Sequence, residues 1–388
     1  INWKRLLPEG PHYFFVEKDF SGKAEYENGF GMQELFPVNS LGLITKRDNL
    51  SISFNTDEQI EKLSYFLNDK NHLADVCEYF GIPIKDKDKW DASIARKNTS
   101  FDEIRKNIFD ILYRPFDTRK IFYNEYFVAR LNKKVLRHLQ YANTAIIIGR
   151  QGQAVGNTGN WNIVYITNSL VDQNIFYRGG GTVFPLYLYP DENTLNHTEK
   201  RRPNLDPSIV QEIAQRTGLT FTEEKEDREN TFAPMDVLDY IYAVLYSTIY
   251  REKYREFLKI DFPRIPYPEN AEHFQTLASY GSLLRSLHLM EKVSPARDTA
   301  DFPVAGTNKI ETLQYQGGRV YVNKRQYFEP IPPEIWGCSI GGYRPAEKWL
   351  KDRRGRVLSF EDIEHYQKII TVLKMTIPLQ LQIDAVIA

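Results

Sequence analysis

The stretch "MDVLDYIYAVLYST", residues 235–248, separates two parts of the sequence that differ in pattern. Five of its side chains recur at the spacing i, i+4, i+7, i+8 and i+11, which predicts a helix with one buried stripe: Val237, Ile241, Val244, Leu245 and Thr248. Strand-like runs are frequent before this helix, and helical spacing dominates after it. This change of pattern predicts an α+β fold in two lobes.

The first part alternates between strand and helix patterns. Residues 11–55 carry short apolar runs between Gly and Asp turns, as strands and hairpins do, whereas residues 57–110 follow helical spacing. Strands are expected again in runs rich in β-branched and aromatic residues: 111–116, 120–124, 144–149, 161–167 and 183–189. Gly-rich loops are expected between these strands, at 149–160 and 177–182.

A loop and a short helix precede the second part. Residues 207–218 predict a short helix that ends at Gly218, and residues 311–323 predict a hairpin. A last helix is expected to begin at Ser359, with Asp362 completing a capping box, and Pro378 is expected to end or kink it. The predicted domains are an N-terminal α+β lobe, a linker with a short helix and a mostly helical C-terminal lobe: 1–190, 191–233 and 234–388.

The composition narrows the class of protein. The 388 residues carry a formal net charge of -1, so any surface that attracts a polyanion must be a local patch. Cys77 and Cys338 form neither a disulfide framework nor a zinc-spaced cluster, which suits a reducing, cytoplasmic setting. No apolar run approaches the roughly 20 residues of a membrane helix, so no membrane partner is expected. Because the chain opens at Ile1 without Met, we expect it to be a piece of a longer protein.

The sharpest catalytic pattern is G-x-S-x-G at residues 337–341, with Ser339 in the place of a nucleophile. Asp352, Asp362 and His365 follow it in the order that α/β-hydrolases use. A nucleophile elbow needs a buried strand before the serine, whereas three prolines precede this one and disfavour a central strand. We therefore interpret residues 337–341 as a tight glycine turn.

Other chemical signals are weaker. Gly152, Gly156 and Gly159 match neither the dinucleotide-binding fingerprint nor the P-loop. The E-x-K tripeptide at 223–225 lies in a charged run that is typical of a solvated connector. The histidines are scattered, and those at 288 and 365 are expected on helix surfaces. The sequence therefore predicts no catalytic residue and no metal site.

Two segments concentrate basic side chains with aromatic ones between them. Residues 114–137 hold seven Lys or Arg against two carboxylates, and residues 341–356 hold six against two. Basic side chains neutralise phosphates, while aromatic and amide groups stack on bases or read them. A solvated helix face is the ordinary alternative for such a run. Since Gly355 interrupts the second segment just before Ser359, its arginines are expected on a turn at a helix N-terminus, which suits a phosphate.

Several longer segments carry a family pattern: "YRPFDTRKIFYN" (113–124), "VFPLYLYP" (183–190), "DYIYAVLYSTIYREKYREFLKIDFPRIPYP" (239–268) and "WGCSIGGYRPAEKWLKDRRGRVLSFEDIEHYQKII" (336–370). With "LGLITKRDNL" (41–50), they resemble the C-terminal specificity region of type ISP restriction-modification enzymes. The resemblance covers nearly the whole chain and keeps the order of the segments. Tyr246 stands where the family pattern leads us to expect His, so base preference cannot be carried over.

The resemblance implies a division of labour. Type ISP enzymes join a nuclease, a DNA-translocating helicase-like ATPase, an adenine methyltransferase and a target-recognition domain in one chain. The methyltransferase and helicase motifs are absent from this sequence. The resemblance therefore implies no cofactor here, with S-adenosylmethionine, ATP and Mg²⁺ used by upstream domains. The implied partners are double-stranded DNA and the upstream methyltransferase and helicase domains.

We therefore predict sequence-specific recognition of double-stranded DNA, which would direct an upstream adenine-specific methyltransferase and restriction nuclease. The predicted DNA-contacting residues are Arg114, Arg119, Lys120, Lys134, Gln151, Asn157, Arg178, Tyr343, Arg344, Lys348, Arg353, Arg354 and Arg356. The alternative is a protein-interaction module that docks on the upstream domains without reading DNA. A hydrolase centred on Ser339 is a third hypothesis.

Overall fold

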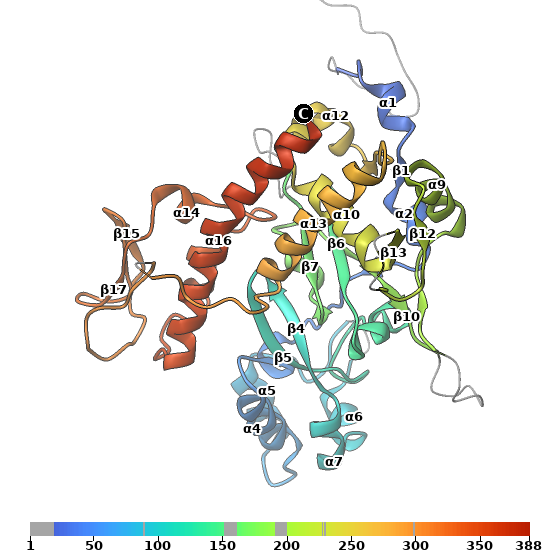
Figure 1. Ribbon diagram of the computed structural model, residues 1–388. Coiled ribbons are helices and arrows are strands. Elements are labelled where there is room, and N and C mark those ends of the chain that lie inside the picture. The colour runs from blue at the N-terminus through green and yellow to red at the C-terminus, as the bar shows by residue number, and fades with distance from the viewer. Residues whose placement is uncertain are drawn as a thin grey trace, which may run out of the picture.

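The computed structural model describes residues 19–87, 90–150, 161–190, 200–226, 228, 230–297 and 299–388. Helices and mostly antiparallel sheets alternate along the chain, which confirms the predicted α+β fold. Figure 1 shows strands near the centre, the helices of residues 56–106 at the lower end and the long C-terminal helix on the left of these strands.

The first four-stranded sheet joins segments that are far apart in the sequence. Its order is β2 (Ser40–Leu41), β9 (Gly181–Pro185), β6 (Ala145–Gly149) and β7 (Val164–Thr167), and neighbouring strands run antiparallel. Every residue of β6, β7 and β9 is buried, which explains why their sequences are continuous apolar runs. The predicted strands at 144–149, 161–167 and 183–189 are confirmed, the last one divided into β9 and β10 (Tyr187–Leu188).

The second four-stranded sheet contains a hairpin that carries part of the first basic segment. Its order is β3 (Ile52–Ser53), β5 (Asp117–Phe122), β4 (Ile108–Arg114) and β8 (Leu170–Val171). At the turn between β4 and β5, Phe116 has a φ of +63°, which is costly for a bulky residue. Two contacts hold this turn: the Phe116 N–H donates to the Tyr165 hydroxyl at 3.2 Å, and the His365 ring contacts the Phe116 carbonyl at 2.9 Å.

The helices expected between residues 57 and 110 are present as α4 (Thr56–Leu67), α5 (Leu73–Phe80), α6 (Ala92–Lys97) and α7 (Phe101–Lys106). The helix α7 begins at a Ser100 cap, where Glu103 completes a capping box. The buried side chains of these helices form a core cluster of their own with Leu50, Phe122 and Phe127. They lie beside the second sheet, at the lower end of Figure 1.

The helix predicted at residues 235–248 is α10 (Pro234–Tyr246), and it is buried on every side from Val237 to Tyr246. Its contact with α13 (Ala271–His288) is so close that a Cβ built on Gly281 would lie 1.8 Å from the Asp239 carbonyl oxygen. Three other helices belong to this part: α9 (Pro207–Thr217), which ends at Gly218 as expected, α11 (Thr248–Lys253) and α12 (Arg255–Leu258).

The last helix, α16 (Phe360–Ile387), begins at the predicted Ser359 cap but does not end at Pro378. It is the one helix of the described residues that has the length and apolar composition to cross a membrane. The sequence analysis expected no segment of this length and apolar composition, and it was wrong for this helix. Of its most apolar window, 44% is buried in the fold, and it packs against α10, α11, α13 and α15 (Pro345–Lys351), as core helices do.

A small antiparallel sheet lies beyond α16, on the left of Figure 1. It contains the predicted hairpin, β15 (Gln314–Gln316) and β16 (Arg319–Tyr321), and a third strand, β17 (Tyr327–Phe328). The short helix α14 (Pro333–Gly337) follows it. Phe328 of β17 packs on Tyr366 of α16, with ring centroids 4.5 Å apart, so the small sheet is anchored to the long helix.

Several short elements join distant segments. Around residues 23–51 lie α1 (Lys23–Glu27), β1 (Phe30–Gly31), α2 (Met32–Leu35) and α3 (Asp48–Ser51). Among these, β1 pairs with the distant β14 (Arg264–Ile265). Later in the chain, β10 pairs with β11 (Arg202–Pro203), and β12 (Thr220–Phe221) pairs with β13 (Thr231–Phe232). After β5 come α8 (Lys133–Leu136), η1 (Arg137–Gln140) and later η2 (Gln173–Ile175). The hairpins expected in residues 11–55 were wrong for the described part, because β1, β2 and β3 pair with distant strands.

Buried side chains of both predicted lobes, from Tyr26 to Ile383, belong to one core cluster. The pairing of β1 with β14 is one of the links between them. A boundary near residues 191–233 therefore does not separate two cores, and the domain limits stay a prediction.

Candidate nucleic-acid interface

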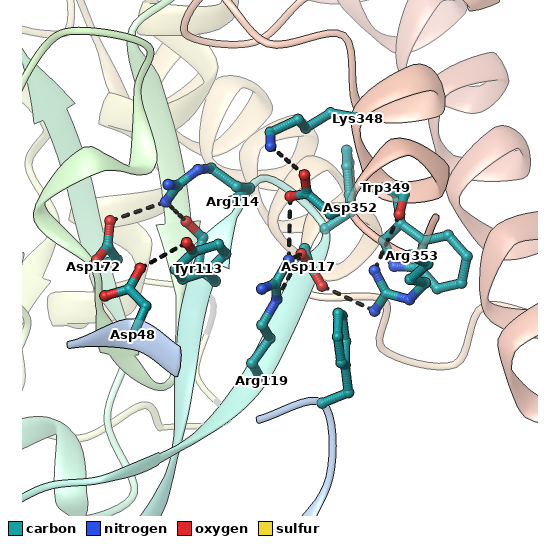
Figure 2. Close-up of polar contacts among 12 residues, drawn as sticks. Asp48, Tyr113, Arg114, Asp117, Arg119, Asp172, Lys348, Trp349, Asp352 and Arg353 are labelled. Atoms are coloured by element: carbon teal, nitrogen blue, oxygen red, sulfur yellow. Dashed lines mark hydrogen bonds and ion pairs between the residues drawn. The ribbon is translucent and has the colours of Figure 1, made fainter. Parts of the chain in front are cut away.

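The two basic segments meet at Asp117, the first residue of β5 (Figure 2). Asp117 is 1% exposed, and its two carboxylate oxygens accept from different arginines: Arg353 Nη2 at 3.0 Å and Arg119 Nη2 at 2.7 Å. Burial alone would raise the pKa of Asp117, but Arg353 and Arg119 outweigh it and hold that pKa below its usual value. Asp117 is therefore a buried, ionised carboxylate that holds two arginines inside the fold.

Other basic candidates pair in the same way. Arg114 Nη1 donates to Asp172 at 2.9 Å, Arg119 also reaches Asp352 at 3.1 Å, and Lys120 Nζ contacts Asp110 at 2.5 Å. Lys348 also pairs with Asp352, and Arg356 pairs with Glu58 of α4. Figure 2 shows two of the pairs, Arg119 with Asp352 and Arg353 with Asp117, which join the β4–β5 hairpin to the turn between α15 and α16.

One aromatic ring adds to this junction. The guanidinium groups of Arg356, Arg119 and Arg353 lie 4.2, 4.5 and 4.8 Å from the centroid of the Phe54 ring. Arg353 also stacks on Trp349, 3.6 Å from its ring centroid. Cation–π contacts of this kind are stronger when they are desolvated, so they stabilise the junction beyond the ion pairs.

The burial of these side chains bears on the sequence-based prediction. The side chains of Arg114, Arg119 and Arg353 are only 12%, 11% and 8% exposed. A guanidinium that already bonds a buried carboxylate would have to leave it unpaired in order to reach a phosphate, at a cost of several kcal/mol. Contact of these three with DNA stays a prediction, and their geometry argues for a structural role.

A different part of the surface brings together the Gly-rich loop at 177–182 and the glycine turn at 337–341. We call it the loop surface and define it as Asn162, Tyr177, Arg178 and residues 339–344. The Tyr177 N–H donates to the Gly341 carbonyl at 2.7 Å, and the Gly341 N–H donates to the Asn162 carbonyl at 3.0 Å. Asn162 Nδ2 reaches the Ser339 carbonyl at 2.8 Å, and Tyr177 meets Tyr343 edge to face.

The loop surface depends on glycine at position 341. Gly341 has a φ of +56°, and a Cβ built on it would lie 2.0 Å from Cδ1 of the buried Phe176. A larger residue would therefore push the loop away from the first sheet. Tyr177, Arg178, Ser339 and Arg344 are exposed around this fixed point.

The remaining candidates have different surroundings. The Arg344 side chain is 56% exposed and lies 3.5 Å from the Glu347 carboxylate; Tyr343 lies half-buried beside Arg114. Lys134 is exposed on α8, next to Lys133, which lines a hollow with Lys106 of α7. Arg354 is exposed and donates through Nε to the Glu311 carbonyl. Gln151 and Asn157 lie outside the described residues.

Two sequence-based expectations need correction. The N-terminus of α16 is occupied by its own capping box, Ser359 with Asp362, and Glu361 adds a second carboxylate, so it offers little to a phosphate. His288 is not on a helix surface: it is 3% exposed, and its ring bonds Tyr242 and Thr376. Burial lowers its pKa to about 3.

The rejected hydrolase pattern has the wrong surroundings in the structure as well. The helix α14, rather than a strand, precedes Ser339. The Ser339 hydroxyl accepts a hydrogen bond from Asn162 Nδ2 at 3.0 Å. His365 instead stacks on Trp349 and contacts the Phe116 carbonyl. Within the described ranges, no group of three or more His, Cys, Asp or Glu side chains could hold a metal ion.

The sequence-based prediction did not include Asn162 and Tyr177 among the candidate DNA-contacting residues. Tyr177 is the first residue of the Gly-rich loop at 177–182, and Asn162 follows the one at 149–160, but their meeting with residues 339–344 depends on contacts across more than 160 positions. The composition of the loops could have indicated them as candidates. Their partner could not be inferred.

The fold and this surface define an α+β domain whose exposed loops carry aromatic, amide and basic groups on a rigid sheet. The chain matches the model of the type ISP C-terminal specificity domain over residues 34–380 and therefore belongs to this family. This confirms the resemblance found in the sequence. Comparison with curated proteins gives no match.

Solved structures of longer enzymes contain a similar fold. The DrdV–DNA complex has a TM-score of 0.71 at 20% identity, covering 98% of this chain and 40% of that one. The ATP-dependent type ISP restriction-modification enzyme LlaBIII, bound to DNA, has a TM-score of 0.69 at 16% identity, covering 97% and 26%. A nuclease-deletion mutant of the type ISP enzyme LlaGI, with a DNA substrate mimic, has a TM-score of 0.67 at 18% identity, covering 98% and 30%. The chain thus spans less than half of each of these proteins.

Proposed function

We propose that this chain recognises a specific sequence in double-stranded DNA. The observation that carries the proposal is the match to the specificity-domain family over residues 34–380. Three similar folds come from enzymes that were solved with DNA or a DNA mimic, which supports the same function. With a formal net charge of -1, the chain would hold the duplex through local surfaces rather than through overall charge.

The loop surface is the proposed reader of bases. Arg178 and Arg344 are exposed and can donate two parallel hydrogen bonds to guanine, while the Asn162 and Ser339 side chains can read other base edges. The backbone bonds among Tyr177, Gly341 and Asn162 hold these loops before DNA arrives, which reduces the cost of ordering them. Gln151 and Asn157 stay candidate readers from the neighbouring segment.

The wider setting follows from the family. We infer that the chain works as part of a longer cytoplasmic protein, in which an adenine methyltransferase and a nuclease with a translocating ATPase would use S-adenosylmethionine, ATP and Mg²⁺. By gripping the duplex beside the target, the specificity part would let the methyltransferase turn its adenine out of the helix. Docking on upstream domains without DNA contact is the competing function.

The test is selection of bound duplexes from a randomised pool, with single variants of the loop surface. Arg344→Ala and Arg178→Ala should each relax the preference at one base pair by about 1–3 kcal/mol. Lys374→Ala, an exposed cation on α16, is the matched control and should leave the selected sequence unchanged. If the unaltered chain enriches no sequence, the docking function is favoured instead.

A further inference from the structure

The cations of residues 306–357 are of two kinds. Lys348, Arg353 and Arg356 pair with carboxylates. Five others are exposed and, in the part of the chain that the structure describes, form no ion pair: Lys309, Lys324, Arg325, Lys351 and Arg354. A cation that no internal carboxylate neutralises keeps its charge available to an external anion, so this second group is the more informative one.

The backbone brings these five residues together from three segments, which we call the turn surface: residues 306–311, 323–326 and 351–357. The first segment lies between the other two. The Gly355 N–H donates to the Ile310 carbonyl at 2.7 Å, and the Ile310 N–H donates to the Arg356 carbonyl at 2.9 Å. On the other side, Asn323 Nδ2 donates to the Lys309 carbonyl at 3.1 Å.

Buried amides fix the turn that carries Lys324 and Arg325. Asn323 and Gln326 flank these two residues and are 7% and 1% exposed. Asn323 Oδ1 accepts the backbone N–H groups of Arg325 and Gln326 at 3.0 and 2.8 Å. Gln326 Nε2 donates to the Val304 carbonyl at 2.9 Å. Lys324 and Arg325 therefore lie on a turn whose backbone is already fixed, which lowers the entropy lost when a ligand binds.

The local charge favours an anion. The three segments contain seven Lys or Arg and only two carboxylates, Glu311 and Asp352. Asp352 is already engaged by Lys348 and Arg119, and two of the seven cations, Arg353 and Arg356, pair with carboxylates outside the three segments. The five exposed cations therefore share the three segments with Glu311 as the one remaining carboxylate. The turn surface therefore differs from the junction at Asp117, where carboxylates balance the arginines.

From these contacts we propose that the turn surface binds the phosphate backbone of duplex DNA beside the bases that the loop surface reads. This inference rests on the proposed function and adds a second contact, on the small sheet β15–β17 and the turn before α16. Compact cations on fixed turns neutralise phosphates and release counterions, and they read no bases. Their contribution is equal for every DNA sequence and falls with salt.

The experiment compares the triple variant Lys309→Gln/Lys324→Gln/Arg325→Gln with a control triple, Lys97→Gln/Lys292→Gln/Lys374→Gln. The control cations are exposed, form no ion pair among the described residues and change the net charge equally. The affinity of the whole chain for duplex DNA is measured from about 50 to about 200 mM salt, a range over which phosphate contacts make the affinity fall strongly. Thermal unfolding checks that both variants fold.

The turn variant should reduce the slope of log K against log salt by about 2–3, since each phosphate contact contributes about 0.9. It should weaken selected and random duplexes by the same factor, and the control slope should stay that of the unaltered chain. An unchanged slope in the turn variant, or an equal fall in the control, would overturn this inference while leaving the proposed function intact. Failure of the unaltered chain to bind any duplex would remove both.

Discussion

Arg353 donates to Asp117 at 3.0 Å across 236 positions of sequence, and both side chains are buried. This bond ties the β4–β5 hairpin to the turn between α15 and α16. Phe116, at the turn of the same hairpin, contacts Tyr165 of the first sheet and His365 of α16. The junction therefore fixes the C-terminal turns relative to the sheets that carry the loop surface.

Asp117→Ala should destabilise the chain by about 3–5 kcal/mol, because it leaves two buried arginines with fewer partners than they need. Asp110→Ala, in the exposed pair with Lys120 on the same hairpin, is the control and should cost less than about 1 kcal/mol. Urea unfolding of both variants measures the difference. Equal, small losses would show that the junction contributes little to stability.

His288 predicts a dependence of stability on pH. Its pKa is lowered to about 3 in the folded state by burial, with a smaller effect from Arg251, against 6.5 as the ordinary value. Between these values the unfolded chain binds a proton that the folded chain does not, so stability falls as pH drops below about 6.5. Each pH unit in this window costs about 1.4 kcal/mol.

His288→Gln removes this titration and keeps a neutral side chain that can bond Tyr242 and Thr376. From pH 7 to pH 5, the unaltered chain should lose about 2 kcal/mol more stability than the variant does. Urea unfolding of both proteins at the two pH values gives the result. Parallel losses in the two proteins would mean that His288 is protonated in the folded state.

Gly281→Ala tests the close contact between α10 and α13. The added methyl would meet the Asp239 carbonyl oxygen at 1.8 Å, so the helices must separate, at a cost of at least about 2 kcal/mol. Ser279→Ala on the exposed side of α13 should be neutral or slightly stabilising. A Gly281 variant as stable as the Ser279 variant would refute this packing.

Gly341→Ala tests the loop surface without removing a polar group. The new Cβ would clash with Phe176 and must adopt a left-handed φ, so the loop should move and the sequence preference should weaken. Gly337→Ala is the control, since a Cβ there meets nothing within 4 Å. Selection from randomised duplexes compares the two. A sharp preference in the Gly341 variant would mean that residues 339–344 do not read bases.

The sequence predicted most of the regular elements that carry strong local signals. The buried strands at 144–149 and 161–167 are apolar runs, and the Ser359 capping box located the start of α16. The two-residue strands β1 and β14 have no periodicity to detect, so their pairing could not be foreseen. Pro378 was expected to end or kink α16, but the helix continues past it, where Leu379 and Ile383 are still buried.

The candidate site was predicted in part. Gly-rich loops and basic turns indicated residues 177–182 and 339–344, which the structure brings together. The arginines at 114, 119 and 353 looked the same in the sequence as the exposed ones at 344 and 354. What distinguishes them is a carboxylate far away in the chain, such as Asp117 for Arg353. Local charge patterns carry no information about such partners.

The central claim is that the chain distinguishes one DNA sequence from another. The most direct measurement is the ratio of its dissociation constants for a selected duplex and a shuffled duplex of equal length and composition, at one physiological salt concentration. The account predicts that the selected duplex binds at least about 10³-fold more tightly. Equal affinities for the two duplexes would contradict it.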